Sequence, residues 1–226
     1  MGATLKILAS PGVRAAVNAL IGGFESATGH KVVASYDVIA VIKRRIEAGE
    51  TFDIVVPGPE LIEELVHRGK VAPDSPTPFA RTGLGVAIVK GAPRPDLSTV
   101  DALKRTLLEA KAVGHSREGA SGTNFLAMLD ELGIMEEMRA KLHVSSAGNP
   151  IAEGKTELVV TGMGPAMEMA GADFVGGLPP GAQRYVTFHA GISATTEHPE
   201  AARELLRYLT GSPAAAAMFQ AKGLER

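Results

Sequence analysis

The fold is indicated most clearly by the stretch His115-Ser116-Arg117-Glu118-Gly119-Ala120-Ser121-Gly122-Thr123-Asn124-Phe125-Leu126. The apolar run Ala112-Val113-Gly114 before it is typical of a strand. The residues after it have the apolar spacing of an amphipathic helix that ends at Gly133. The stretch is therefore predicted to be a strand-to-helix turn of an α/β protein, with Ser121 as the N-cap of the helix.

This turn has the composition of an anion-binding site. The first N–H groups of a helix have no acceptor within the helix and lie at the positive end of its dipole, so they favour an oxyanion. Gly122 would let the backbone approach a ligand closely, while Ser116, Arg117 and Thr123 would add hydroxyl and guanidinium donors. An ordinary capped turn that binds nothing has the same residues, so both interpretations stand for this stretch alone.

The composition excludes several classes of function. The 226 residues are 45% hydrophobic and 21% charged, which is typical of a globular protein with a proper core. The net charge is −2, and neither a basic block nor Trp is present, so nucleic acid is not an expected partner. Cys is absent, which excludes disulfides, thiolate metal sites and a Cys nucleophile.

The sequence predicts no membrane insertion, because no run reaches about 18 continuous apolar residues. The N-terminal residues lead directly into the apolar run Leu5–Ala9, which is interpreted as a first strand and not as a secretory signal. Two locations follow from this. The protein is expected to be periplasmic if a signal peptide has been removed, and cytoplasmic otherwise.

The first third of the chain alternates strand and helix. Strands are predicted at Leu5–Ala9, Lys31–Ser35 and Phe52–Val56, and helices at Val13–Ala27, Val38–Ala48 and Glu60–His67. Three successive strand–helix units predict a parallel sheet with right-handed crossovers.

Two long apolar runs separate this block from a second one. The first is Phe79–Val89 and the other is Tyr185–Ala194, and the chain ends in two predicted helices at Pro199–Leu209 and Pro213–Ala221. Two α/β lobes joined by two crossing strands explain this order. The expected lobes are residues 1–82 with 190–226, and residues 83–189.

The predicted strand ends carry polar turns. Ligands of open α/β sheets bind at the carboxyl ends of the strands. The turns there are Ser10-Pro11-Gly12, Tyr36-Asp37, His115–Gly122 and Thr161–Pro165, and they are rich in the hydroxyl groups and glycines that a small-anion cleft requires.

Several segments together resemble one family, the type II periplasmic solute-binding proteins. They include Gly29-His30-Lys31-Val32, Ile46-Glu47-Ala48-Gly49 before Phe52-Asp53-Ile54-Val55, and the tail from Ser212-Pro213 to Leu224-Glu225. The nearest branch is that of the molybdate-binding-protein-like receptors of ABC importers. The resemblance implies two lobes, each a mixed and mainly parallel sheet flanked by helices, that close over an anion through a hinge of two crossing strands.

The resemblance also implies where the ligand binds. Ser10 with Pro11 occupies the first oxyanion-binding position, Tyr36 and Ile39 belong to the second loop, and Ser121–Thr123 form the helix start of the second lobe. Ser116 and Arg117 are added from the turn itself, with Arg117 as a carboxylate clamp. Met163 is added from the turn Gly162–Pro165, which either donates N–H groups to a ligand or is a plain turn.

One departure from the family pattern bears on the ligand. Molybdate receptors have small hydroxyl residues at the second loop, whereas this chain has Tyr36-Asp37-Val38-Ile39-Ala40. A buried tetrahedral oxyanion would lose donors there, and Asp37 would repel it. The sequence therefore favours a larger, partly apolar carboxylate over molybdate.

The same branch resembles aconitate isomerase, an enzyme with this fold that moves a double bond in a tricarboxylate. The alternative to a receptor is accordingly an isomerase that acts by proton abstraction, with Asp37, His115 and His189 as candidate bases. A hydrogen-bonded structural role is the competing interpretation of both histidines, and an ion pair that of Arg81.

No spacing of His, Asp and Glu predicts a metal site, and no cofactor motif is present. The expected partners are a small anionic ligand and, if the protein is exported, the membrane subunits of an ABC importer.

Overall fold

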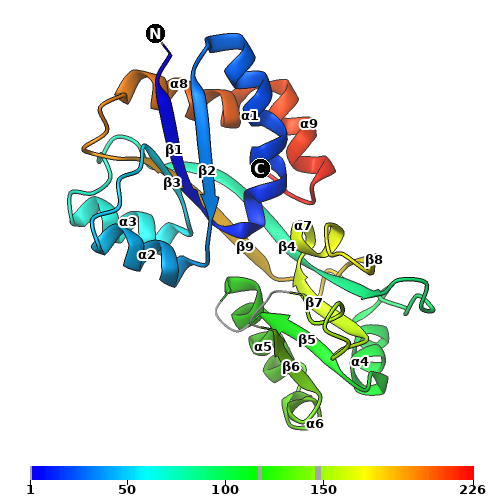
Figure 1. Ribbon diagram of the computed structural model, residues 1–226. Helices are drawn as coiled ribbons and strands as arrows, with labels where there is room; N and C mark the ends of the chain where they lie inside the picture. The colour runs from blue at the N-terminus through cyan, green and yellow to red at the C-terminus, as the bar shows by residue number, and fades with distance from the viewer. Residues whose placement is uncertain (1, 117–118, 146–148) are drawn as a thin grey trace. The chain divides into compact units, whose positions relative to one another are not determined.

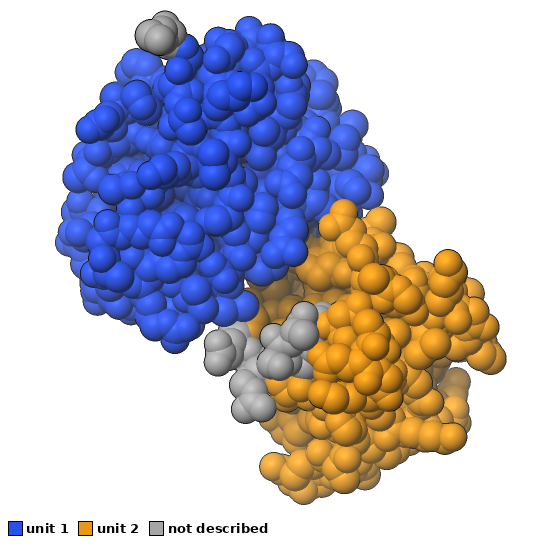
Figure 2. All heavy atoms as spheres, viewed as in Figure 1, with its two compact units in different colours: residues 1–81, 187–226 blue, residues 82–186 orange. Residues whose placement is uncertain are grey.

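A computed structural model describes residues 2–116, 119–145 and 149–226. The chain divides into two compact units (Figure 2), unit 1 with Met1–Arg81 and Thr187–Arg226 and unit 2 with Thr82–Val186. The chain passes between them twice, within the long strands β4 (Thr77–Val89) and β9 (Tyr185–Ile192).

Unit 1 is built on parallel strands that alternate with helices, as the sequence predicts. Its strand order is β2-β1-β3-β9, and β3 and β9 are antiparallel. The remaining elements are β1 (Thr4–Ala9), the 3-10 helix η1 (Pro11–Val13), α1 (Arg14–Thr28), β2 (Lys31–Tyr36), α2 (Ile39–Glu47), β3 (Ile54–Val56), α3 (Pro59–His67), α8 (Pro199–Gly211) and α9 (Pro213–Ala221).

Helices cover both faces of this sheet (Figure 1). One core joins Leu8 and Val55 of the strands to the buried faces of α2 and α3. Because successive strand residues face opposite sides, Ile7 and Ile54 face the other layer, where α1, α8 and α9 pack against one another. The sheet is thus buried on both sides, which explains its nearly continuous apolar strands.

Unit 2 has the strand order β4-β7-β5-β6, with β8 also paired to β4. β5 runs parallel to β6 and β7, whereas β4 is antiparallel to β7 and β8. The elements are α4 (Val100–Glu109), β5 (Val113–Ser116), α5 (Ala120–Glu131), α6 (Met135–Arg139), β6 (Leu142–Ser145), β7 (Leu158–Gly162), α7 (Met163–Met167) and β8 (Ala172–Gly177).

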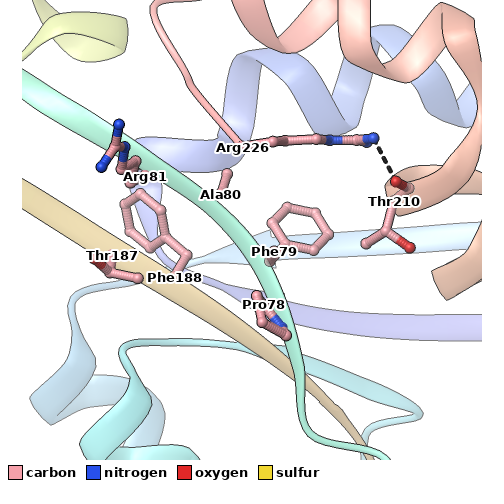
Figure 3. Close-up of a pocket in the computed structure, with 8 residues that line it drawn as sticks. All are labelled: Pro78, Phe79, Ala80, Arg81, Thr187, Phe188, Thr210 and Arg226. Carbon is pink, nitrogen blue, oxygen red and sulfur yellow. Dashed lines mark hydrogen bonds between the residues drawn. The ribbon is translucent and has the colours of Figure 1, made fainter.

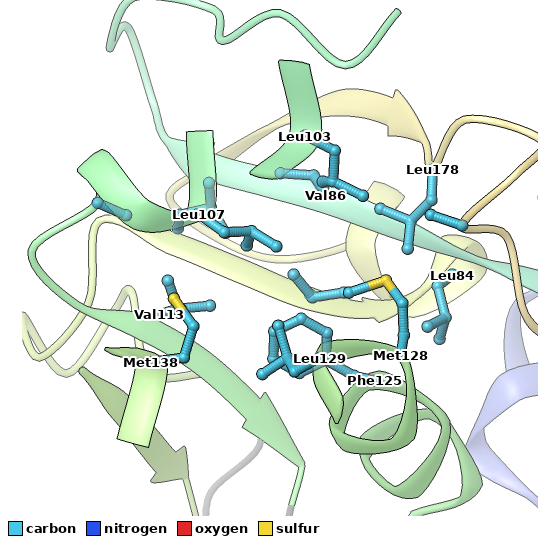
Figure 4. Close-up of a cluster of buried hydrophobic side chains, with 14 of the residues drawn as sticks. Leu84, Val86, Leu103, Leu107, Val113, Phe125, Met128, Leu129, Met138 and Leu178 are labelled. Atoms are coloured by element: carbon cyan, nitrogen blue, oxygen red, sulfur yellow. The ribbon is translucent and has the colours of Figure 1, made fainter. Parts of the chain in front are cut away.

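The core of unit 2 packs α4, α5 and α6 on this sheet (Figure 4). Phe125, Met128 and Leu129 of α5 are fully buried and pack with Leu103 and Leu107 of α4. Burial of a large apolar side chain contributes about 1.5–3 kcal/mol. The helix that the sequence predicts after Ser121 is therefore held by its apolar stripe.

We predict that Phe125→Ala lowers the free energy of unfolding by about 3–5 kcal/mol, because it leaves a cavity in this core. The measurement is a urea titration followed by circular dichroism. Asp130→Ala, at an exposed position of the same helix, is the control and should change stability by less than about 0.5 kcal/mol. Equal effects of the two substitutions would refute the packing role of Phe125.

Candidate functional site

The carboxyl ends of three strands are aligned in unit 1. Ala9 is in register with Tyr36 of β2 and with Val56 of β3. The residues that follow these strands therefore lie along one edge of the sheet. This edge brings together four residues that the sequence predicts to contact a ligand, namely Ser10, Pro11, Tyr36 and Ile39.

The hydroxyl of Ser10 is buried at this edge without a hydrogen-bond partner among the described residues. The N–H of Ser10 donates to the Val56 carbonyl oxygen at 3.0 Å, and its carbonyl accepts from the Val13 N–H at 3.2 Å. The residue is only 5% exposed, yet its hydroxyl has no hydrogen-bond partner among the described residues. A buried polar group without a partner costs about 1–3 kcal/mol, so a ligand oxygen bonded here would recover that loss.

Pro11 and Gly12 shape the turn that carries Ser10. Pro11 is the first residue of η1 and has no N–H to offer a ligand. A Cβ atom on Gly12 would lie 2.5 Å from Cζ of Phe188 in β9, so the ring of Phe188 packs directly on this glycine. The contribution of Pro11 is therefore the geometry of the helix start.

Tyr36 is held by two residues of α1. Its hydroxyl donates to Oδ1 of Asn18 at 2.6 Å, and the guanidinium of Arg14 lies 5.2 Å from the centre of its ring. Burial raises the pKa of Tyr36 to about 12, so the phenol is protonated at neutral pH. Tyr36 thus offers a fixed ring face, and its hydroxyl proton is already used by Asn18.

The carboxylate of Asp37 is paired with Arg45. Nη1 of Arg45 donates to Oδ2 of Asp37 at 2.6 Å, and the same guanidinium binds both oxygens of Glu50 and the hydroxyl of Ser35. Hydrogen bonding to Glu50, and then to Asp37, raises the pKa of Arg45 above its usual range. Arg45 therefore stays charged, and its pairing with Asp37 reduces the repulsion between that carboxylate and an anion.

Ile39 is the first residue of α2, whose N-cap is Val38. The first N–H groups of this helix have no acceptor within it. The side chain of Ile39 also contacts the turn before α3, since its Cδ1 would lie 3.6 Å from a Cβ on Gly58. Ile39 thus gives this edge an apolar surface beside two helix starts.

In unit 2 the helix after β5 begins two residues earlier than the sequence predicts. Gly119 is its N-cap, and the carbonyl of Gly119 accepts from the N–H groups of Gly122 at 2.9 Å and Thr123 at 3.2 Å. The prediction that Ser121 is the N-cap is therefore wrong. Its hydroxyl instead lies 3.4 Å from that of Ser116, so the two side chains do meet.

Gly122 lies against the end of β5. A Cβ on this residue would lie 1.9 Å from the carbonyl oxygen of Ser116. The close approach that glycine allows here is that of α5 to the end of β5, and the N–H of Gly122 is already bonded. Thr123 is exposed on the next position of the helix. Arg117, the predicted carboxylate clamp, lies outside the described residues.

The three candidate bases have different surroundings. Asp37 is ion-paired with Arg45. His115 is 6% exposed, its Nδ1 lies 2.9 Å from the Ser116 carbonyl oxygen, and its ring packs 6.0 Å from that of Phe125. The N–H of His189 donates to the Pro57 carbonyl oxygen at 3.0 Å, which places this half-buried residue beside the end of β3.

Met163 packs inside unit 2. Its Sδ would lie 3.3 Å from a Cβ on Gly177, and its Cγ 3.0 Å from one on Gly85. The side chain therefore fills the space above two glycines of β8 and β4. Arg81, by contrast, pairs with the chain end: its Nε donates to Glu225 at 2.9 Å.

Two cavities, one in each unit, are lined by none of the predicted ligand-binding residues. A cavity of about 170 Å³ in unit 1 is mainly apolar, and Arg226 at its rim donates to the Thr210 carbonyl oxygen (Figure 3). A pocket of about 380 Å³ in unit 2 has one guanidinium, from Arg105, among the carboxylates of Asp96, Glu109 and Glu157. Its negative charge does not suit an anion. Among the described residues no cluster of His, Asp and Glu could hold a metal ion.

Residues 5–225 match the family model described as bacterial extracellular solute-binding protein. The chain belongs to this family. It is 31% identical over 224 residues to an aconitate isomerase of a Pseudomonas species, which covers 95% of this chain and 85% of that protein.

Solved structures share the fold. The periplasmic molybdate-binding protein of Azotobacter vinelandii superposes with a TM-score of 0.82 at 19% identity, covering 98% of this chain and 99% of its own. PEB3 of Campylobacter jejuni with L-phospholactate bound gives a TM-score of 0.76 at 13% identity, with 98% and 99% covered. These similarities confirm the expected type II periplasmic-binding-protein fold. No helix in the described part of the chain is long and apolar enough to cross a membrane.

Three residues of the unit 1 edge are absent from the sequence-based site. Asn18 and Arg14 hold Tyr36, and Arg45 holds Asp37. Helical periodicity gives part of the signal, because Arg14 and Asn18 are four residues apart and so share a face of α1. Their contacts with Tyr36 join α1 to β2, and spacing along the chain does not reveal such tertiary contacts.

We predict that Gly122→Ala destabilises the protein by about 1–3 kcal/mol, because the added methyl group forces α5 away from β5. Thermal unfolding of the purified variant measures this. The matched control is Gly22→Ala in α1, where a Cβ meets nothing within 4 Å. That substitution should stabilise the helix by about 0.5–1 kcal/mol. A Gly122→Ala protein as stable as the parent would contradict the packing argument.

Proposed function

We propose that this protein is a solute-binding protein for a small organic anion that carries carboxylate groups. The observation that carries the proposal is the buried Ser10 hydroxyl, which lacks a partner among the described residues at the aligned strand ends of unit 1. The starts of helices α1 and α2 adjoin the same edge and favour negative charge.

An organic carboxylate suits this edge better than an inorganic oxyanion such as molybdate or sulfate. Ile39 and the ring of Tyr36 give it apolar surface, and the Tyr36 hydroxyl is engaged by Asn18. A ligand with a carbon skeleton can bury apolar area against these residues while its carboxylate accepts from Ser10. Molybdate or sulfate would use the donors and leave the apolar surface uncovered.

Ser116, Ser121 and Thr123, with the first N–H groups of α5, are proposed to bind an anionic group in unit 2. Two hydroxyls within 3.4 Å of each other, those of Ser116 and Ser121, support this. In this proposal the protein acts outside the cytoplasm and passes its ligand to the membrane subunits of an ABC importer. The family description, which names extracellular solute-binding proteins, supports that part.

We predict that Ser10→Ala weakens binding of the carboxylate ligand at least tenfold, because a hydrogen bond to a charged group contributes about 1.5–3 kcal/mol. The ligand-free variant should be as stable as the parent or more stable by up to about 1 kcal/mol, because an unpaired buried hydroxyl has been removed. Calorimetric titration with succinate, tricarballylate, sulfate and molybdate gives the affinities, and thermal unfolding gives the stability.

The control for this experiment is Ser26→Ala on an exposed face of α1. It should change the affinity by less than a factor of two and the free energy of unfolding by less than about 0.5 kcal/mol. The proposal is wrong if none of these anions binds the parent protein. It is also wrong if Ser10→Ala binds as tightly as the parent.

An isomerase is the second candidate, and the 31% identity to aconitate isomerase favours it. Such an enzyme needs a base beside the bound carbon. Of the three candidates, His189 has no side-chain hydrogen bond to the described residues and lies at the end of β3, whereas Asp37 and His115 are engaged. His189 is therefore the base that this alternative would use.

We predict for the receptor that cis- and trans-aconitate incubated with the protein in deuterated buffer are recovered unchanged, as proton NMR would show. Isomerisation or deuterium exchange would instead establish the enzyme, and His189→Gln should then abolish turnover while leaving binding within about threefold. A His189→Gln protein with full turnover would exclude His189 as the base.

A further inference from the structure

Arg14 is an arginine of unit 1 that no carboxylate of the described residues pairs with. Arg45, Arg68, Arg81 and Arg203 all form ion pairs with Asp or Glu side chains. Arg14 instead lies over the face of Tyr36 at 5.2 Å. A guanidinium over an aromatic ring keeps its N–H donors at the rim, where they remain able to bind a second group.

The position of Arg14 relates it to the binding edge. It is the first residue of α1, and the three residues of the 3-10 helix η1 separate it from Ser10, the N-cap of η1. A 3-10 helix rises about 2 Å per residue, so η1 separates the two backbone positions by about 6 Å. A ligand with two separated carboxylates can place one carboxylate at each residue.

No carboxylate of the described residues neutralises the charge of Arg14 at this edge. The carboxylate of Asp37 follows Tyr36 directly, but Arg45 pairs with it at 2.6 Å. Tyr36 itself stays neutral, since burial raises its pKa to about 12. The Tyr36 hydroxyl is bonded to Asn18 at 2.6 Å, which fixes the ring on which Arg14 stacks.

We propose that Arg14 binds a second carboxylate of the ligand whose first anionic group is held at Ser10, so that the protein selects di- and tricarboxylates over monocarboxylates and inorganic oxyanions. This inference rests on the proposed function, because it assumes that Ser10 bonds the ligand. The planar guanidinium donates two parallel N–H bonds to one carboxylate, and the Tyr36 ring keeps the guanidinium oriented for them.

The test is calorimetric titration of the parent, Arg14→Gln, Arg14→Lys and Arg44→Gln proteins with acetate, sulfate, succinate and tricarballylate. Arg14→Gln should weaken succinate and tricarballylate at least tenfold and change sulfate and acetate by less than twofold. Arg14→Lys should restore part of the affinity, because it keeps the charge and loses the bidentate geometry. Arg44→Gln removes the same charge from an exposed position of α2 and should leave all four affinities within twofold.

The dependence on the number of ligand carboxylates separates binding from a structural role, which would weaken every ligand alike. The inference is overturned if Arg14→Gln binds tricarballylate within twofold of the parent while Ser10→Ala weakens it, and the proposed function then stands. It is also overturned if Arg14→Gln weakens all four ligands equally. If the parent binds none of the four, both the inference and the proposed function fail.

Discussion

The register of the parallel strands is the constraint on which the binding edge depends. Ala9 is in register with Tyr36 and Val56, so three neighbouring strands end at the same edge of the sheet. Each exit leads into a helix, and each helix start presents N–H groups that have no intrahelical acceptor. A shift of one residue in β1 would move Ser10 out of line and turn its neighbours to the opposite face. Hydrogen bonding of the sheet therefore fixes the geometry of the site before any ligand is present.

The negative charge of Asp37 and the positive charge of Arg14 have different partners at this edge. Asp37 is an unfavourable neighbour for an anion, and Arg45 offsets it while also binding Glu50. Hydrogen bonding to Arg45 lowers the pKa of Glu50, so this network keeps its charges as the pH falls toward the usual range for a carboxyl group. Arg14 has an aromatic ring in place of a carboxylate partner among the described residues, and so keeps its donors. The pattern favours a ligand that is anionic, extended and partly apolar.

Much of the fold could be predicted from the sequence, because apolar periodicity marks elements that are buried on one or two faces. The strand–helix units of the first third and the two long strands are found at the expected residues, and the comparisons confirm the type II fold. Local turn chemistry was less predictable. Ser121 is a good N-cap residue, yet the N-cap of α5 is Gly119. Gly122 lies against the Ser116 carbonyl, a tertiary contact with no local signal. The pairing of Asp37 with Arg45 and the stacking of Arg14 on Tyr36 join different elements, so spacing along the chain could not reveal them.

A crystal structure of the protein with tricarballylate bound tests the central claim most directly. The account predicts that a carboxylate oxygen of the ligand lies within hydrogen-bond distance of the Ser10 hydroxyl, at about 2.5–3.0 Å. A ligand held elsewhere, for example in the apolar cavity beside Arg226, with the Ser10 hydroxyl still without a partner, would contradict it.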